Sequence, residues 1–260
     1  HDMQTPNNAH TELAATVGFI ARYASYLMGS GVHTSRVVRN SRRIGAALDV
    51  EINLAVFPKS IIVSGTDTEG ETFSRVVTIP ACPIDFERNA DLSALSWEAY
   101  DCKLSLQQIE KRYEELCAKP RLDPMLVMIL AGIANAAFCH LFGGDFQAMG
   151  VVFTATLFGF FVKQKLAQRG LNHYLVFIVA AFAASLLSSM SLILDAKSDV
   201  ALATSVLFLI PGVPLINGFI DIIEGHILTG ISRLTAAIML IACIAIGLSA
   251  TLMMVKSELL

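Results

Sequence analysis

The sequence predicts a helical membrane protein in which a soluble α+β domain precedes five transmembrane helices. Of the 260 residues, 54% are hydrophobic and 16% are charged, whereas a typical soluble domain has about 25% charged residues. The charges are also unevenly distributed, since residues 1–123 hold 13 Lys/Arg and 16 Asp/Glu and residues 124–260 hold only 6 of each. Because long apolar stretches fill the second half, the first half is the soluble part.

In the first half, apolar residues recur at helical spacing over residues 11–28, and Gly29-Ser30-Gly31 supplies a stop. A second helix is expected from a cap at Thr34 or Ser35 to about Leu48. Alternating patterns then predict strands, with a hairpin turn at residues 66–70, and helical periodicity returns before Pro120. The expected strands are 52–57, 60–64 and 73–79, and the expected later helices are 90–101 and 105–118.

The second half contains five apolar stretches, at residues 124–142, 147–162, 174–194, 200–223 and 231–255. The loop at 163–169 is short and basic, whereas the segments 143–145 and 195–199 hold one cation between them. Cytoplasmic loops carry the excess of Lys and Arg, so we expect a cytoplasmic N-terminal domain and a C-terminus outside. The expected domains are a cytoplasmic α+β domain at 1–120, with residues 1–3 left over from cloning, and a transmembrane domain at 121–260.

Composition also excludes several classes of protein. A net charge of −3 and a pI near 6.1 provide no basic surface, so nucleic acid is not an expected partner. The five cysteines are far apart and form no C-x-x-C pair, so we expect reduced thiols, no metal site and no cofactor. No basic and apolar leader opens the chain, and no set of residues has catalytic spacing.

The fourth apolar stretch contains Pro211 and Pro214, which lack two amide donors and predict a broken helix at residues 210–214. Lipid does not satisfy the backbone groups that such a break frees, so the break is expected to face protein or a water-filled cavity. The amides of Gly212 and Val213 then begin a half-helix, whose positive end attracts a substrate carboxylate.

Downstream of the break, Asn217, Asp221 and Glu224 recur at spacings of four and three residues and share one stripe of that helix. A carboxylate inside a membrane is a functional candidate by default, so Asp221 is the leading candidate for proton coupling or substrate gating. In the alternative interpretation, the prolines only kink a structural helix, and Glu224 and His226 are solvated at the cytoplasmic interface.

Two further sets of polar residues are weaker candidates. Asn135 lies among small residues of the first apolar stretch, where it either lines a pathway or bridges helices. Arg36, Arg39 and Arg43 form a basic stripe on the second helix. This stripe either steers anions to the membrane or is a solvated face paired with local acids.

Two motifs resemble those of the threonine/serine exporter family: Gly31-Val32-His33-Thr34-Ser35-Arg36-Val37, and Pro211-Gly212-Val213-Pro214-Leu215-Ile216-Asn217-Gly218 followed by Asp221, Gly225, Gly230 and Arg233. The resemblance covers the chain from about Glu12. It implies a cytoplasmic α+β domain joined to a membrane domain, and export driven by the proton motive force. Full members resemble two fused five-span halves, and this chain resembles the larger subunit of the split form, which is linked to succinate export.

The resemblance thus implies a non-enzymatic exporter subunit in a bacterial inner membrane, surrounded by lipid. Its expected substrate is a small metabolite with a carboxylate, either a C4-dicarboxylate such as succinate or threonine and serine. The expected partners are a second, small multi-span membrane subunit, further copies of the chain, or both. Two alternatives from other classes are a membrane-tethered enzyme with the soluble domain as catalyst, and a structural subunit that does not transport.

Overall fold

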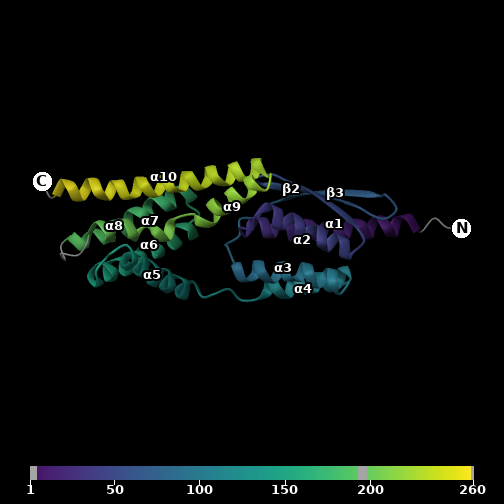
Figure 1. Ribbon diagram of the computed structural model, residues 1–260, viewed down its shortest axis with the longest axis horizontal. Coiled ribbons are helices and arrows are strands. Elements are labelled where there is room, and N and C mark those ends of the chain that lie inside the picture. Colours follow the sequence, from purple (N-terminus) through teal and green to yellow (C-terminus); the bar gives the residue numbers. More distant parts are fainter. Residues whose placement is uncertain (1–4, 193–197, 259–260) are drawn as a thin grey trace. The chain divides into compact units, whose positions relative to one another are not determined.

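The computed structural model describes residues 5–192 and 198–258, and the chain divides into two compact units (Figure 1). Unit 1 joins the chain up to Pro120 to Val213–Thr235, and unit 2 joins Arg121–Gly212 to the C-terminal part from Ala236 onward. The unit built on the expected soluble domain therefore also contains a segment from the second half of the sequence. The expected cloning residues 1–3 and the first three residues of the expected outer segment 195–199 lie outside the described residues.

Unit 1 begins with two helices and a three-stranded meander: α1 (Thr5–Gly29), α2 (Thr34–Ala47), β1 (Glu51–Val56), β2 (Ser60–Thr66) and β3 (Thr72–Thr78). The sheet is antiparallel in the order β1-β2-β3, and Val63 of β2 lies opposite Leu54 and Arg75. α1 packs on β2 and β3, and α2 packs on β1. Gly65 of β2 permits this close approach, since a side chain there would meet Val17 of α1.

Two more helices, α3 (Phe86–Asp101) and α4 (Leu106–Ala118), complete this part of unit 1, with α3 packed on α2. Asp85 caps α3 by accepting from the Arg88 amide, and Ser105 and Gln108 form a capping box at α4. The prediction missed the first turn of α3 because its Phe-Glu-Arg-Asn sequence contains one apolar residue and so has no helical stripe.

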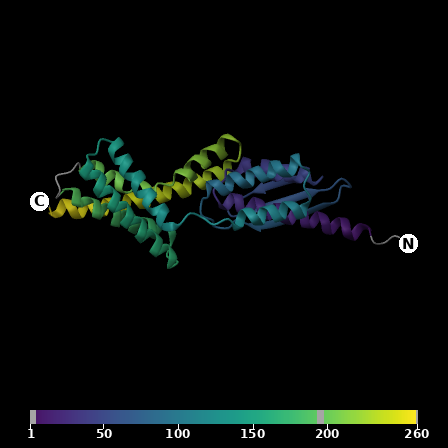
Figure 2. The ribbon, with the colours of Figure 1, turned by 90° about the horizontal axis from the view of Figure 1, so that it is seen from below.

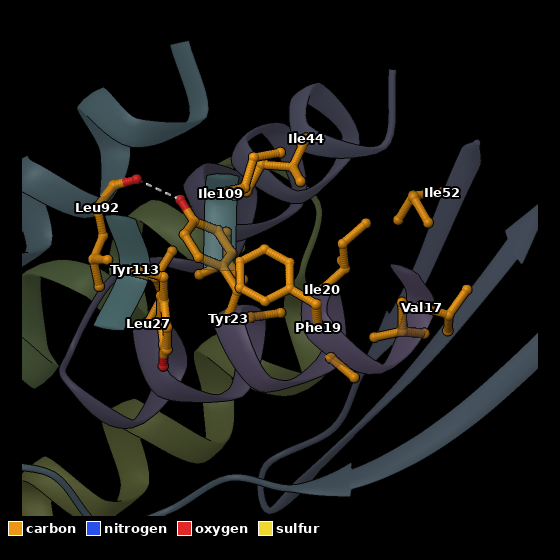
Figure 3. Packing of buried hydrophobic residues seen from close by; sticks show 14 of the residues in the cluster. Val17, Phe19, Ile20, Tyr23, Leu27, Ile44, Ile52, Leu92, Ile109 and Tyr113 are labelled. Atoms are coloured by element: carbon orange, nitrogen blue, oxygen red, sulfur yellow. Dashed lines mark hydrogen bonds between the residues drawn. The ribbon is translucent and has the colours of Figure 1, made fainter. Parts of the chain in front are cut away.

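The core of unit 1 lies around α1, whose buried side chains pack against residues of the sheet and of α2, α3 and α4 (Figure 3). Tyr23 is fully buried and its hydroxyl donates to the Leu92 carbonyl at 2.7 Å. Tyr113 of α4 packs edge-on against Phe19 of α1 with a centroid distance of 5.6 Å. The apolar spacing in 11–28 is therefore the stripe of a helix at the centre of the domain.

Unit 2 contains α5 (Pro124–Leu141), α6 (Phe146–Gln168), α7 (His173–Ser188), α8 (Ser198–Ser205) and two short 3₁₀ turns, η1 (Ser189–Leu192) and η2 (Leu207–Leu209). The chain continues with α9 (Gly212–Ile223) and α10 (Ile227–Glu258). Among the described residues, four helices are long and apolar enough to cross a membrane: α5, α6, α7 with η1, and α10. The segments Asp199–Leu209 and Gly212–Ile223 form one bent pair, which makes up to five spans.

The prediction of a basic loop at residues 163–169 is wrong. Residues 163–168 form the last turns of α6, and Arg169 is its C-cap. A hydropathy window ends at the first charge, whereas Lys, Gln, Leu and Ala all have high helix propensity and continue the helix. The connection to α7 is reduced to Gly170, Leu171 and Asn172, with Gly170 at φ +71° and Asn172 capping α7.

Small residues allow the helices of unit 2 to pack closely. A Cβ at Gly159 of α6 would lie 2.7 Å from the Ala184 Cβ of α7, and one at Gly247 of α10 would collide with the Ile178 carbonyl of α7. Asn135 of α5 is buried and its amide donates to the Thr156 hydroxyl of α6 at 3.0 Å. Asn135 thus bridges two helices, as one of its two interpretations requires.

Candidate functional site

The prolines of the broken segment lie at the beginning of α9. The helix breaks at Ile210 and Pro211 and resumes at Gly212, so Pro214 falls in the first turn, where a missing N–H leaves no hydrogen bond unmade. The break is therefore shorter than the expected 210–214. Gly212 and Val213 lie in the first turn of α9, as expected for the start of a half-helix.

α9 and the first turns of α10 run side by side as a hairpin, called here the α9–α10 hairpin (Figures 1 and 2). Gly225 turns the chain between the two helices at φ +89°, and the His226 amide donates back to the Asp221 carbonyl at 2.7 Å. The helices touch at two glycines, since a Cβ at Gly230 would lie 2.7 Å from the Gly218 carbonyl. This close approach positions every polar side chain of the site.

Asp221 is fully buried at the end of α9 and binds the N-terminus of α2. Its Oδ1 accepts from the Thr34 amide at 2.7 Å and its Oδ2 accepts from the Thr34 hydroxyl at 3.0 Å. The predicted cap at Thr34 or Ser35 is therefore wrong. His33 is the N-cap residue and its side chain makes no capping bond, while Asp221, remote in sequence, supplies the acceptor and the negative charge that a helix N-terminus favours.

Arg233 of α10 provides the opposite charge. Its Nη1 lies 3.2 Å from Asp221 Oδ2 in an ion pair, although the angle is not that of a hydrogen bond. Its Nη2 donates to the Val32 carbonyl at 2.9 Å, so Arg233 holds both the carboxylate and the turn before α2. Sequence analysis named Arg233 among the motif residues but gave it no role in the site. The signal that it missed was the presence of two opposite charges, Asp221 and Arg233, in one apolar region.

Asn217 and Glu224 also contact the turn before α2, which comprises Gly31–Ser35. The Asn217 amide donates to the Gly31 carbonyl at 2.6 Å, and Gly31 adopts φ +87°, which favours glycine. Glu224 is partly exposed after α9, with Oε2 3.4 Å from His33 Nδ1 and Oε1 3.6 Å from Arg39 Nη1. The predicted stripe thus faces the Gly31–Ser35 turn of unit 1.

Two groups outside the helices have shifted pKa values. Burial lowers the pKa of His33, while the carboxylate of Glu224 opposes that shift. A hydrogen bond from Ser35 lowers the pKa of Glu224, and the charges of His33 and Arg39 add to the effect. Because His33 is neutral near pH 7, Arg39 is the permanent cation beside Glu224.

The remaining candidate residues lie elsewhere. Arg36 donates to the Ser93 hydroxyl at 3.4 Å and Arg43 donates to the Ser96 hydroxyl at 2.7 Å, so both link α2 to α3. The Arg43 guanidinium also lies 3.5 Å from the centroid of the Trp97 ring. Of the three basic residues, Arg39 alone reaches the α9–α10 hairpin through a contact among the described residues. Asn135 belongs to unit 2.

Four helices that are long and apolar enough to cross a membrane, together with one bent pair interrupted at prolines, indicate a multi-pass membrane protein, and helices broken in this way are typical of transporters. All five cysteines are free, and no cluster of metal-ligating residues occurs in the described part of the chain. The chain belongs to the threonine/serine exporter family ThrE, whose pattern it matches over residues 18–255. That family consists of transporters, so the chain is not an enzyme.

The chain is similar to a protein named as a probable succinate transporter subunit, YjjP, in Klebsiella aerogenes, with 30% identity over 91% of this chain and 93% of that protein. The protein of the same name in Escherichia coli K12 is 30% identical over 85% of this chain and 88% of its own length. A protein named as a probable threonine/serine exporter in Mycobacterium tuberculosis is 26% identical over 87% of this chain but 44% of its own length. No solved structure matches the chain.

Proposed function

We propose that the chain is a subunit of a secondary transporter that exports a small carboxylate-bearing metabolite and is driven by the proton motive force. The metabolite is a C4-dicarboxylate such as succinate, or threonine and serine, as the names of the relatives suggest. The name of the YjjP relatives supports a subunit role, in which a second, small multi-span membrane protein, further copies of this chain, or both complete the pathway.

One observation carries the proposal: the buried carboxylate of Asp221 joins three elements, since it receives the α2 N-terminus from Thr34 and faces Arg233 of α10. The ionised carboxylate makes charge-assisted bonds, which are about twice as strong as neutral ones. When a proton binds to Asp221, Arg233 loses its counter-charge, and the hydrogen bonds that Asp221 accepts from Thr34 weaken. Proton binding at Asp221 thereby weakens the contact between the α9–α10 hairpin and the Gly31–Ser35 turn. This hairpin directly follows the break at Pro211.

The experiment replaces Asp221 in the transporter purified with its co-purifying subunits and reconstituted in proteoliposomes. Asp221→Asn keeps the side-chain shape and removes titration, so pH-gradient-driven export of succinate or threonine should be abolished. Asp221→Glu should retain part of the activity, and Glu224→Gln should be milder because Glu224 is partly exposed. Export at the wild-type rate and with unchanged pH dependence in Asp221→Asn would overturn the coupling role.

A structural effect needs a separate control, because removing one partner of a buried ion pair costs about 3–5 kcal/mol. The double variant Asp221→Asn/Arg233→Gln replaces the pair with two neutral amides. If the pair only stabilises the fold, the double variant should recover both assembly and export. If Asp221 couples protons, assembly recovers and export stays uncoupled from the pH gradient. Should the wild type move neither solute, with or without its co-purifying subunits, the proposed function fails.

A further inference from the structure

Lys163 is a charged residue of unit 2 for which the site above has no role. It lies in α6 and is half-buried, whereas Lys165, Arg169 and Arg121 are exposed. Its Nζ lies 4.9 Å from the centroid of the Phe177 ring of α7 and 5.8 Å from that of Phe160. The ammonium is therefore held between aromatic side chains of two neighbouring helices rather than extended into solvent.

The surroundings of Lys163 leave its charge uncompensated. Aromatic faces attract a cation through their quadrupole but carry no net charge. Residues 146–188 include no Asp or Glu at all, and no carboxylate forms an ion pair with Lys163 among the residues that the structure describes. By contrast, the buried guanidinium groups of Arg88 and Arg233 in unit 1 each lie beside a carboxylate, Asp85 and Asp221.

A histidine ring contacts the same phenylalanine as this lysine. The ring of His173, the first residue of α7, packs against the same Phe177 ring with a centroid distance of 4.8 Å. The imidazole and the ammonium therefore both lie against Phe177, at the joint between α6 and α7. A small molecule that reached Lys163 would find one positive charge, apolar ring faces and the imidazole that packs on the same phenylalanine.

We infer that Lys163 is the cation that binds a carboxylate of the transported metabolite, with His173 as the neighbouring polar contact. This inference rests on the proposed function. Arg233 does not compete for the role, because Asp221 and the Val32 carbonyl occupy its guanidinium. A half-buried ammonium has lost part of its hydration, so its attraction for a carboxylate is stronger than that of an exposed lysine. Its half exposure leaves room for a small anion to approach.

Amine labelling tests the site without any need for transport. Native membranes that contain the full chain are treated with an amine-acylating reagent, and modification of Lys163 and Lys165 is measured by peptide mass spectrometry. Succinate and threonine, each tested alone, are the probes, and the uncharged diamide of succinic acid is the control ligand. Protection of Lys163 by at least one probe, with Lys165 unchanged and no effect of the diamide, is the expected result. Equal labelling with and without both probes would overturn the inference.

Transport kinetics provide the second test, in proteoliposomes that contain the transporter with its co-purifying subunits. Lys163→Gln should raise KM by about tenfold or more, the equivalent of about 1.4 kcal/mol, and Lys163→Arg should recover most of the affinity. Lys165→Gln is the matched control, because it removes the same charge from an exposed position of the same helix. An unchanged KM in Lys163→Gln would overturn the inference while the proposed function stands.

Anionic lipid headgroups also attract an ammonium, so the kinetic test is repeated with two lipid compositions. In vesicles of phosphatidylcholine alone, the effect of Lys163→Gln should persist if the bound anion is the solute. An effect that occurs only when phosphatidylglycerol is present would assign Lys163 to a lipid phosphate and overturn the inference. If the wild type moves neither succinate nor threonine, the proposed function fails, and the labelling result alone decides whether Lys163 binds a carboxylate.

Discussion

Asp221 is both a carboxylate in an apolar segment and the cap of helix α2 in unit 1. Its two bonds to Thr34 satisfy the first amide of α2, which the side chain of the local N-cap residue His33 does not reach. Sequence reasoning singled out Asp221, Asn217 and Glu224 from their spacing, and all three face the Gly31–Ser35 turn. It did not find their partners, since hydrogen bonds between residues so distant in sequence leave no local pattern.

At the residue scale, we predict that unit 1 loses stability as pH falls below about 6.5. Burial lowers the pKa of His33 from its usual 6.5, so the unfolded chain binds a proton that the folded unit resists. The loss begins near the pKa of the unfolded chain and is complete below the pKa of the folded unit. The pKa of Glu224 is lowered from 4.5, so its own contribution is lost only at more acidic pH.

Thermal unfolding of the purified chain in detergent between pH 5 and 7.5 checks this expectation. His33→Gln should flatten the pH dependence, because the variant has no imidazole at that position. His226→Gln, which removes a half-buried imidazole from the α9–α10 turn, is the matched control and should keep the slope. An identical slope in wild type and His33→Gln would show that another group is responsible.

At the scale of elements, the two helices of the α9–α10 hairpin depend on glycine contacts. Gly218 and Gly230 let the backbones of α9 and α10 approach until a Cβ on either helix would meet the other. The sequence predicted a break before α9 because prolines act locally. It did not predict that α9 and the first turns of α10 would join unit 1, because the contacts that unite them with the N-terminal part of the chain involve residues far apart in the sequence.

Gly230→Ala should therefore destabilise unit 1 by about 1–3 kcal/mol, since the new methyl group overlaps the Gly218 carbonyl. Gly150→Ala in α6 is the matched control: its Cβ meets nothing within 4 Å, so the change should be neutral or stabilising by about 0.5–1 kcal/mol. The unfolding midpoints of the two variants measure the difference. Equal midpoints would contradict a close helix contact at Gly230.

At the scale of the whole molecule, we propose that unit 1 lies in the cytoplasm of a bacterial cell and that the C-terminus of α10 lies outside the inner membrane. The basic residues support this orientation. Lys163, Lys165 and Arg169 gather at the C-terminal end of α6, and the first turn of α7 follows after a short connection. The positive-inside rule assigns that end to the cytoplasmic side even though the residues belong to a helix rather than to a loop.

Labelling of intact cells with a membrane-impermeant maleimide tests this topology. The native Cys102 is exposed on unit 1 and should react only after the cells are permeabilised. Two single cysteines are then introduced into a variant without the native cysteines. Leu171→Cys, between α6 and α7, should likewise be protected in intact cells. Phe142→Cys, between α5 and α6, should react from outside. Reaction of Leu171→Cys in intact cells would reverse the orientation.

Hydrophobicity and periodicity are local properties, so the sequence alone determined where most helices and strands lie, that the helix is interrupted near Pro211, and which polar stripe follows the break. Only the tertiary structure decided what that stripe binds. Asp221 meets Thr34 and Arg233, and Lys163 meets Phe177, through contacts between separate elements. Propensity and hydropathy act over a few residues, whereas a buried charge is stabilised by whatever group packing brings beside it, and that pairing is a property of the folded chain.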